Sequence, residues 1–369
     1  MASVERRVRD GQLRYSVRYR APNGAQRSKT FSKKTDAERY LIGIENSKLV
    51  GSYVDPGRSK VTISEWADEW LAAQQHLKPS TYAKHTGTIS KWIKPYWGAT
   101  QLSSVRHADV QRWVGQLPLA PGTKRQVFRV LSMMLDLAVR DARIAVNPAV
   151  GVKLPGAGKP EKRFLSAAQV QELASAAGDQ RVLVLVLAFT GLRWGEAVAL
   201  RAKRVDLMRR RITVAENATE VNRRLIWGTP KSHQSRSVPV PKFLAELLAE
   251  VVVGKQPDDL VFTSKHGQPL RNANFRRDVF DPAAAAVGLP GLTPHELRHT
   301  AASLAIASGA SVKAVQRMLG HASASMTLDT YAGLFEDDLD GVADRMDSLA
   351  GVSPSRHDAS ITQLPARAN

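Results

Sequence analysis

Two short motifs in the C-terminal third of the chain gather residues that can hold and attack a phosphodiester. The first, LTPHELRHT at 292–300, places His295 and Arg298 three residues apart in an expected helix, so both side chains project from one face. The second, LGHASASMTLDTY at 319–331, carries His321 after a glycine and ends on Tyr331. An arginine fork matches phosphate oxygens, an imidazole donates hydrogen bonds or moves protons, and a tyrosine can form an ester with phosphorus.

The composition of the chain points to a polyanionic partner. Its 369 residues carry a net charge of +19 and give a pI near 10.3, so nucleic acid is the first candidate, with a merely basic soluble protein as the alternative. The chain has no Cys, which excludes disulfides, Cys-ligated zinc and a Cys nucleophile. The N-terminus has no apolar signal core, and the longest apolar run, VLVLVLAF at 182–189, is too short to span a bilayer. We therefore expect a soluble, cytoplasmic protein.

The first 60 residues are expected to form a small basic sheet followed by a helix. They hold 14 Lys and Arg against 6 Asp and Glu, a local net charge of +8. In GQLRYSVRYRAPNGAQRSKTF, alternating residues flank an Asn-Gly turn, which predicts a hairpin with Arg14, Arg18 and Arg20 on one strand face. A basic strand face can enter a DNA groove, and the alternative is a solvated sheet face. The Gly- and Pro-containing stretch at 51–60 predicts a linker.

The next part of the chain is expected to be helical with a core of its own. Helical spacing occurs in TISEWADEWLAAQQ and near 80–94, 107–117 and 122–142, and five of the seven Trp lie between Trp66 and Trp113. The Lys- and Pro-rich stretch at 147–163 predicts an interdomain linker. The candidates for phosphate contact in the helical part are basic side chains: Lys84, Lys91, Lys124 and Arg125.

The part from Phe164 to Ala350 is expected to mix helices with a small sheet. Ser166 predicts a helix cap, and the apolar run at 182–189 is a buried strand or a buried helix, because periodicity does not distinguish them. Arg193 stands before a further helix. Short strands are predicted at RVDLM and RITVA, and GTPKSHQSRSVPV at 228–240 predicts a β-hairpin with Lys231 near its turn.

These residues together resemble the tyrosine recombinases, the phage-integrase family. Arg193 in TGLRWGE, Lys231, HELR at 295–298, LGH at 319–321 and Tyr331 follow the order of that family's motifs. The resemblance covers residues from about 62 to 350, and the module before them looks like the arm-binding domain of lambda-type integrases. It implies a multidomain α+β fold with these parts: an arm-type DNA-binding domain at 1–57 made of a three-stranded sheet and a helix, an all-helical core-binding domain at 62–146, a linker at 147–163, a mixed, mainly α catalytic domain with a small sheet at 164–350, and a disordered tail at 351–369.

The resemblance also implies a role for each site residue. Tyr331 would be the nucleophile that leaves a 3′-phosphotyrosine and a free 5′-hydroxyl, and Lys231 would be the general acid. Arg193 and Arg298 would bind the phosphate, and His295 and His321 would be phosphate ligands or proton carriers. We expect Glu196 to orient Arg193, and His299, next to Arg298, to pack. Neither a cofactor nor a metal is expected, because the sequence shows no Asp, Glu and His cluster that demands one.

The implied function is site-specific recombination, most simply the integration and excision of a temperate phage or a related mobile element. The alternatives are a resolvase of chromosome or plasmid dimers, a topoisomerase-like relaxing enzyme and a DNA-binding protein without catalysis. The implied partners are double-stranded DNA with core-type and arm-type attachment sites, three further copies of the chain in a homotetramer, a DNA-bending host factor and an excision directionality factor. The expected location is the cytoplasm of a bacterial host, in association with its nucleoid.

Overall fold

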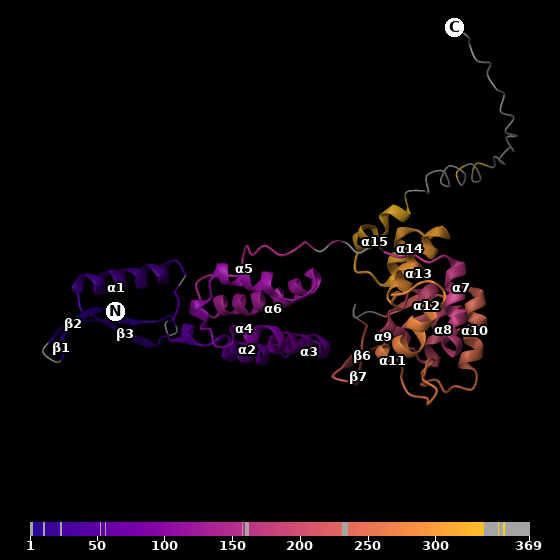
Figure 1. Ribbon diagram of the computed structural model, residues 1–369, viewed down its shortest axis with the longest axis horizontal. Coiled ribbons are helices and arrows are strands. Elements are labelled where there is room, and N and C mark those ends of the chain that lie inside the picture. The colour runs from indigo at the N-terminus through magenta and orange to yellow at the C-terminus, as the bar shows by residue number, and fades with distance from the viewer. Residues whose placement is uncertain are drawn as a thin grey trace, which may run out of the picture. The chain divides into compact units, whose positions relative to one another are not determined.

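The computed structural model describes residues 3–9, 12–22, 24–51, 53–55, 57–156, 158, 162–230, 235–335, 346 and 350. The chain divides into an N-terminal unit, residues 1–159, and a C-terminal unit, residues 160–369, and each is described by itself. Figure 1 shows the order of their elements along the chain. The described residues form three separate hydrophobic clusters, two in the N-terminal unit and one in the C-terminal unit.

The N-terminal unit begins with an antiparallel sheet covered by one helix (Figure 1). The strands β1 (Ser3–Arg9), β2 (Gln12–Arg20) and β3 (Gln26–Phe31) pair in sequence order, and α1 (Lys34–Leu49) packs on β2. Val17 and Tyr19 of β2 are buried against Ala37 of the helix, as the alternating pattern predicts. Asn23 lies outside the described residues. The predicted sheet and helix are confirmed.

The segment expected as a linker at 51–60 packs against its surroundings within the N-terminal unit. Asp55 is buried and accepts a hydrogen bond of 2.6 Å from Arg27 of β3. Its backbone N–H donates to the carbonyl of Ala142, at 3.2 Å, and Arg58 forms a 2.7 Å ion pair with Asp141. The sequence pattern shows turn residues here, but it does not show that they are fixed by contacts.

The second part of the N-terminal unit is helical and is built around indole rings. Trp66, Trp70, Trp97 and Trp113 are buried together, and the Trp66 indole donates to the carbonyl of Met134 at 2.8 Å. The predicted separate core is confirmed. Its elements are η1 (Arg58–Lys60), α2 (Ile63–Ala72), α3 (Pro79–Thr88), a π-helical turn η2 (Ile89–Ile93), α4 (Lys94–Trp97), η3 (Leu102–Ser104), α5 (His107–Gln116) and α6 (Pro121–Arg140).

The C-terminal unit surrounds one buried helix. The apolar run at 182–189 is helical and belongs to α8 (Arg181–Thr190), whose side chains from Leu183 to Ala188 are all buried. The helix α8 contacts α7 (Ala167–Ala176), α9 (Trp194–Ala197), α10 (Lys242–Val252) and α13 (Glu296–Ala307). Ser166 caps α7 as predicted, in a reciprocal capping box with Gln169. The remaining helices are η4 (Gly178–Gln180), η5 (Ala202–Arg204), α11 (Asn272–Phe275), the π-helical η6 (Arg276–Phe280), α12 (Asp281–Ala286), α14 (Val312–Leu319), α15 (Ala324–Tyr331) and η7 (Ala332–Leu334).

The strands of the C-terminal unit form two small sheets. One has the order β4 (Val205–Asp206), β5 (Arg211–Val214) and β8 (Arg236–Pro239), and the other pairs β6 (Asn217–Val221) with β7 (Arg224–Gly228). The predicted hairpin at 228–240 is wrong, because β7 pairs with β6 whereas β8 pairs with β5. The hairpin lies at 217–228, and its turn residues Asn222 and Arg223 both have positive φ, 49° and 62°. Such a turn is usually marked by glycine, and here it is not.

Candidate active site

Tyr331 is a buried tyrosine at the end of α15. Only 2% of its surface is exposed. Burial raises the pKa of its phenol, and the positive charge of Arg298 acts in the opposite direction. Lys162, just before the first helix of this unit, donates a 2.9 Å hydrogen bond to the carbonyl of Thr330 and lies 5.9 Å from the centre of the Tyr331 ring. Phe164 packs against the same ring. The phenol is therefore held by the fold and needs help to ionise near neutral pH.

Arg298 is a buried arginine of α13 held by two backbone carbonyls. Its two terminal nitrogens donate hydrogen bonds of 2.5 Å to the oxygens of Gly191 and Leu319. Gly191, and Gly320 after Leu319, end α8 and α14 in the left-handed conformation, with φ of 65° and 67°, which turns these carbonyls out of their helices. Burial and the nearby charge of Arg193 lower the pKa of Arg298 to about 9. The guanidinium therefore remains charged at neutral pH.

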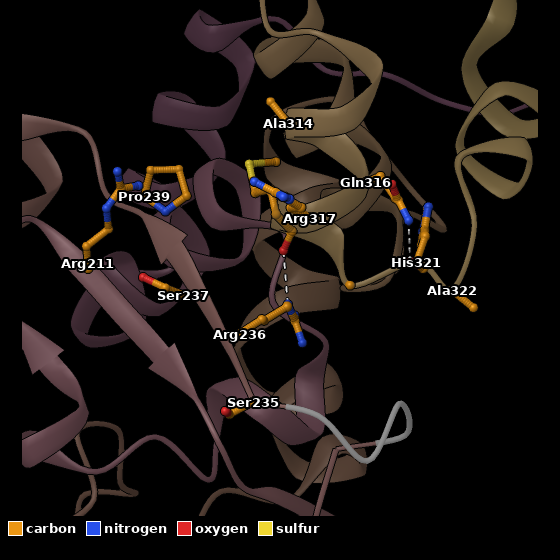
Figure 2. Close-up of a pocket in the computed structure, with 12 residues that line it drawn as sticks. Arg211, Ser235, Arg236, Ser237, Pro239, Ala314, Gln316, Arg317, His321 and Ala322 are labelled. Atoms are coloured by element: carbon orange, nitrogen blue, oxygen red, sulfur yellow. Dashed lines mark hydrogen bonds between the residues drawn. The ribbon is translucent and has the colours of Figure 1, made fainter.

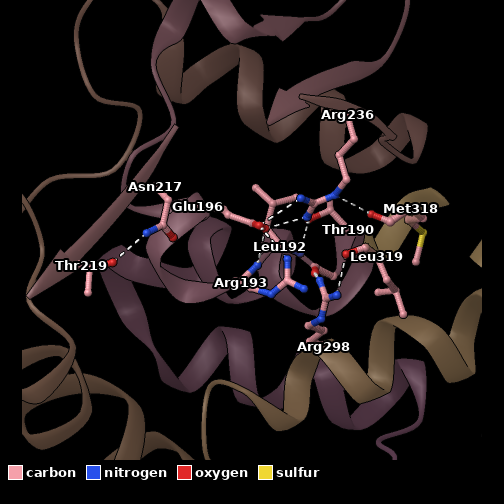
Figure 3. Close-up of polar contacts among 11 residues, drawn as sticks. Thr190, Leu192, Arg193, Glu196, Asn217, Thr219, Arg236, Arg298, Met318 and Leu319 are labelled. Atoms are coloured by element: carbon pink, nitrogen blue, oxygen red, sulfur yellow. Dashed lines mark hydrogen bonds and ion pairs between the residues drawn. The ribbon is translucent and has the colours of Figure 1, made fainter. Parts of the chain in front are cut away.

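Arg193 and Arg236 share one buried carboxylate, that of Glu196 (Figure 3). Arg236 donates to both carboxylate oxygens, at 3.0 and 2.6 Å, and Arg193 donates from its side chain and its backbone, each at 2.9 Å. Burial raises the pKa of Glu196, but the hydrogen bonds and charge of Arg236, then those of Arg193, outweigh burial and lower it. Glu196 thus remains ionised and contacts Arg193, as expected from the sequence. The sequence did not single out Arg236.

Three histidines surround the phenol and the arginines. His321 stacks parallel to the Tyr331 ring with centroids 6.5 Å apart, and its Nδ1 lies 2.9 Å from the hydroxyl of Thr327. Partial burial, then the charges of Arg298 and Arg193, lower the pKa of His321 to about 4 and also lower the pKa of His295. Both imidazoles are therefore neutral near pH 7, and a neutral imidazole still has one N–H to donate.

His299 packs against the Tyr331 ring, as expected, but it also makes a polar contact that the sequence did not predict. Its Nδ1 lies 2.9 Å from the hydroxyl oxygen of Tyr331, and its ring meets that of His295 edge to face, with centroids 5.4 Å apart. Adjacent residues of a helix diverge by about 100°, which is why His299 was assigned away from Arg298. The His299 side chain does point away from that of Arg298, but it points toward α15, which carries Tyr331. No spacing rule within one helix gives this contact, because its partner is 32 residues further along the chain.

Lys231 lies outside the described residues, in the gap between 230 and 235. The other candidate site residues converge: Arg193 and Glu196 come from the start of α9, His295 and Arg298 from the start of α13, His321 from the turn after α14, and Tyr331 from the end of α15. A depression of about 920 Å³ opens beside them between β8 and α14 (Figure 2). Arg211, Arg236 and Arg317 are among its lining residues, so the depression is basic.

The candidate DNA-contact residues lie in the N-terminal unit. On β2, Arg14 donates to Gln12, Arg18 pairs with Glu5 at 3.2 Å, and Arg20 is exposed. In the helical part, Lys84 and Lys91 are exposed, with Lys91 over the ring of Trp92. Lys124 donates to the carbonyl of Gly115, and Arg125 donates to that of Pro155. Lys124 and Arg125 thus have intramolecular partners that a DNA phosphate would have to replace.

The described residues include neither a membrane-spanning helix nor a cluster of metal ligands. No helix in the described part of the chain is long and apolar enough to cross a membrane. Over the same residues, no three His, Cys, Asp or Glu side chains lie together in a way that would hold a metal ion.

The chain is similar in sequence and in fold to known proteins. The pattern of the Phage integrase family matches residues 162–337, and that of the Phage integrase, N-terminal SAM-like domain matches residues 62–117. An integrase of Mycobacterium phage D29 is 28% identical over 373 residues, which cover 95% of this chain and 97% of that protein.

Two solved integrases share the fold. A Tn1549 transposon integrase in complex with a circular intermediate DNA has a TM-score of 0.68 at 21% identity, over 77% of this chain and 99% of the other. A lambda integrase tetramer bound to a Holliday junction has a TM-score of 0.59 at 18% identity, over 86% and 95%. The two matched regions together span more than half of the sequence, and the chain belongs to the phage integrase family of tyrosine site-specific recombinases.

Proposed function

We propose that the chain cuts and rejoins DNA by attack of Tyr331 on a backbone phosphodiester, with a 3′-phosphotyrosine intermediate and a free 5′-hydroxyl. The observation that carries this proposal is a buried tyrosine within reach of the charge of Arg298, which itself is fixed by two carbonyls. A second guanidinium, Arg193, is fixed by Glu196. Charged groups that are already oriented stabilise a pentavalent phosphorane without reorganising during the reaction.

Each site residue has a role in this reaction. Arg193 and Arg298 bind the non-bridging oxygens of the scissile phosphate, and neutral His295 and His321 donate hydrogen bonds to them. Lys231 gives a proton to the departing 5′ oxygen. Glu196 positions Arg193. Because the ester keeps the energy of the broken bond, the reverse attack by a 5′-hydroxyl from another strand needs neither nucleotide nor cofactor.

The biological reaction that we propose is integration and excision of a temperate phage or a related mobile element. Support comes from the integrase of phage D29, which aligns with nearly the whole chain, and from the small basic sheet that precedes the helical domain. We assign residues 1–57 to arm-type sites, 62–146 to core-type sites and 164–350 to catalysis, with a linker at 147–163 and a tail at 351–369. The active form is a homotetramer on DNA in the bacterial cytoplasm, assisted by a bending host factor and a directionality factor.

The test of this proposal is covalent capture. The protein is first used to footprint and cleave the DNA around its own coding region, which defines the core site. A nicked duplex with that site then traps the cleaved state, because the short strand carrying the 5′-hydroxyl diffuses away. We expect the native chain to give a protein–DNA band that survives boiling in detergent, and Tyr331→Phe to bind the duplex without giving the band. Tyr96→Phe, at an exposed tyrosine of the N-terminal unit, is the matched control and should give the band. A band from Tyr331→Phe would identify another nucleophile, and protection of direct repeats at a chromosome-dimer site instead of an attachment site would favour a resolvase.

A further inference from the structure

We propose that His299 is the general base that takes the proton from Tyr331. The proposal rests on the cleavage reaction proposed above and assigns the one proton that reaction leaves without an acceptor. Its basis is the 2.9 Å separation between Nδ1 of His299 and the phenolic oxygen, across α13 and α15. That separation is within the reach required of a general base.

The other two histidines are less well placed for this proton. The ring nitrogens of an imidazole point along its plane, and the plane of His321 is tilted by only 5° from that of Tyr331 at a centroid separation of 6.5 Å. One nitrogen of His321 is also taken by the Thr327 hydroxyl. His295 contacts the ring of His299 and, among the described residues, has no hydrogen bond to the phenol. Of these three histidines, only His299 has a ring nitrogen within hydrogen-bond distance of the phenolic oxygen.

The surroundings of His299 keep that nitrogen free to accept a proton. Partial burial lowers the pKa of His299. The charge that His295 takes up when protonated and the charges of Lys162 and Arg298 lower it further, and Glu296 acts against them. The imidazole is therefore neutral near pH 7, and in the tautomer that carries its proton on Nε2 the lone pair of Nδ1 faces the phenol. Lys162 lies over the Tyr331 ring and donates to the carbonyl of Thr330, and Phe164 packs against the same ring, so the tyrosine is also restrained by contacts other than that with His299.

The step balances without another reactant. The O–H bond of Tyr331 breaks and an N–H bond forms at Nδ1 of His299, while the phenolic oxygen forms its bond to phosphorus. The bond from phosphorus to the 5′ oxygen breaks, and Lys231 supplies the proton that this oxygen takes up. The two protons therefore move at different ends of the phosphorane, one to His299 and the other from Lys231. In the rejoining step, each proton returns by the same route.

The experiment measures the cleavage rate of the full-length chain on the nicked core-site duplex. In His299→Ala the acceptor is gone, and in His299→Asn an oxygen replaces Nδ1 as hydrogen-bond acceptor but does not take up a proton. We expect both to cleave about 100-fold more slowly or worse, which is the usual contribution of a general base, with unchanged affinity in a filter-binding assay. His266→Asn, at an exposed histidine elsewhere in the same unit, should cleave at the native rate.

A modified duplex separates the base from the acid. When sulfur replaces the bridging 5′ oxygen, the leaving group no longer needs a proton, so Lys231→Ala should recover its rate whereas both His299 variants should remain slow. If His299→Asn cleaves at the native rate, His299 only positions the phenol. If the His299 variants recover their rate on the sulfur substrate, His299 acts at the leaving group. Either result overturns the assignment. Absence of any covalent complex from the native chain would instead refute the proposed reaction, and the base with it.

Discussion

The substitution Arg236→Ala should destabilise the C-terminal unit, because it leaves a buried carboxylate with half of its side-chain partners. The Glu196 side chain is completely buried and that of Arg236 is 9% exposed, so water screens this pair little. Breaking a buried ion pair by removing one partner costs about 3–5 kcal/mol. We expect the lower end, about 3 kcal/mol, because Arg193 still donates twice to the carboxylate.

The assay is thermal and urea unfolding of the native chain and the variant at pH 7. For a unit of this size, about 3 kcal/mol corresponds to a fall in Tm of roughly 6–12 °C. The matched control is Arg276→Ala, which removes an ion pair with Asp281 whose side chains are 37% and 45% exposed, and should cost less than about 1 kcal/mol. The double variant Glu196→Gln/Arg236→Ala should lose less stability than the sum of the two single variants, because it leaves neither the buried Glu196 carboxylate without Arg236 nor the buried Arg236 guanidinium without its carboxylate. Strict additivity, or a loss for Arg236→Ala as small as that of the control, would refute the reasoning.

The same pair predicts a pH dependence. The pKa of Glu196 is lower in the folded chain than in the unfolded one, so its stabilisation is complete above the unfolded pKa, about 4.3 for a glutamate, and is lost as the pH falls through the folded value. The difference in unfolding free energy between the native chain and Arg236→Ala should therefore shrink below about pH 4. A difference that stayed constant from pH 7 to pH 3 would contradict an ionised Glu196.

Three further predictions concern the reaction and its DNA. Arg298→Ala should reduce the cleavage rate by at least 100-fold, which is the usual loss when one preorganised donor is removed. The dissociation constant for the core duplex should barely change, because only one phosphate contact among many is lost. A parallel loss of binding would indicate a structural role. Cleavage of the nicked duplex should proceed in EDTA and without nucleotide, and a strict need for a divalent ion in that step would contradict a site whose positive charge comes from Arg and Lys. A chain that begins at Val61 should still cleave core sites but fail to recombine a full attachment site; normal recombination by it would refute a separate arm-site function for residues 1–57.

Local signals in the sequence predicted much of the fold. The capping box at Ser166, the clustered Trp of the helical part and the alternating pattern of β2 all appear in the structure, because each depends on neighbours in the chain. The apolar run in α8 was ambiguous because a helix that is buried on every side has no polar face to reveal its period. The β6–β7 hairpin was missed because its turn, at Asn222 and Arg223, lacks the glycine that usually marks positive φ.

The site was predictable only as a set of residue types. The order of the motifs predicted that one site contains Arg193, His295, Arg298, His321 and Tyr331, but it did not predict which atoms each side chain contacts. The sequence did not predict the contacts of Arg236 and His299, because their partners, Glu196 and Tyr331, are 40 and 32 residues away. The contacts of Arg298 could not be predicted for another reason. Its acceptors are peptide oxygens, which every residue possesses and no letter of the sequence distinguishes.

These peptide oxygens make the position of Arg298 insensitive to most mutations nearby. A substitution at position 319 does not remove the backbone carbonyl, so the arginine keeps that acceptor whatever side chain the position carries, provided that α14 still ends in the same way. The vulnerable points are the glycines that end α8 and α14. A Cβ at Gly191 would lie 2.6 Å from the Leu319 side chain, and one at Gly320 would lie 2.9 Å from that of Arg236. Mutations that only exchange the side chain at position 319 should therefore be tolerated at this site, whereas any substitution of Gly191 or Gly320 adds a side chain where none fits.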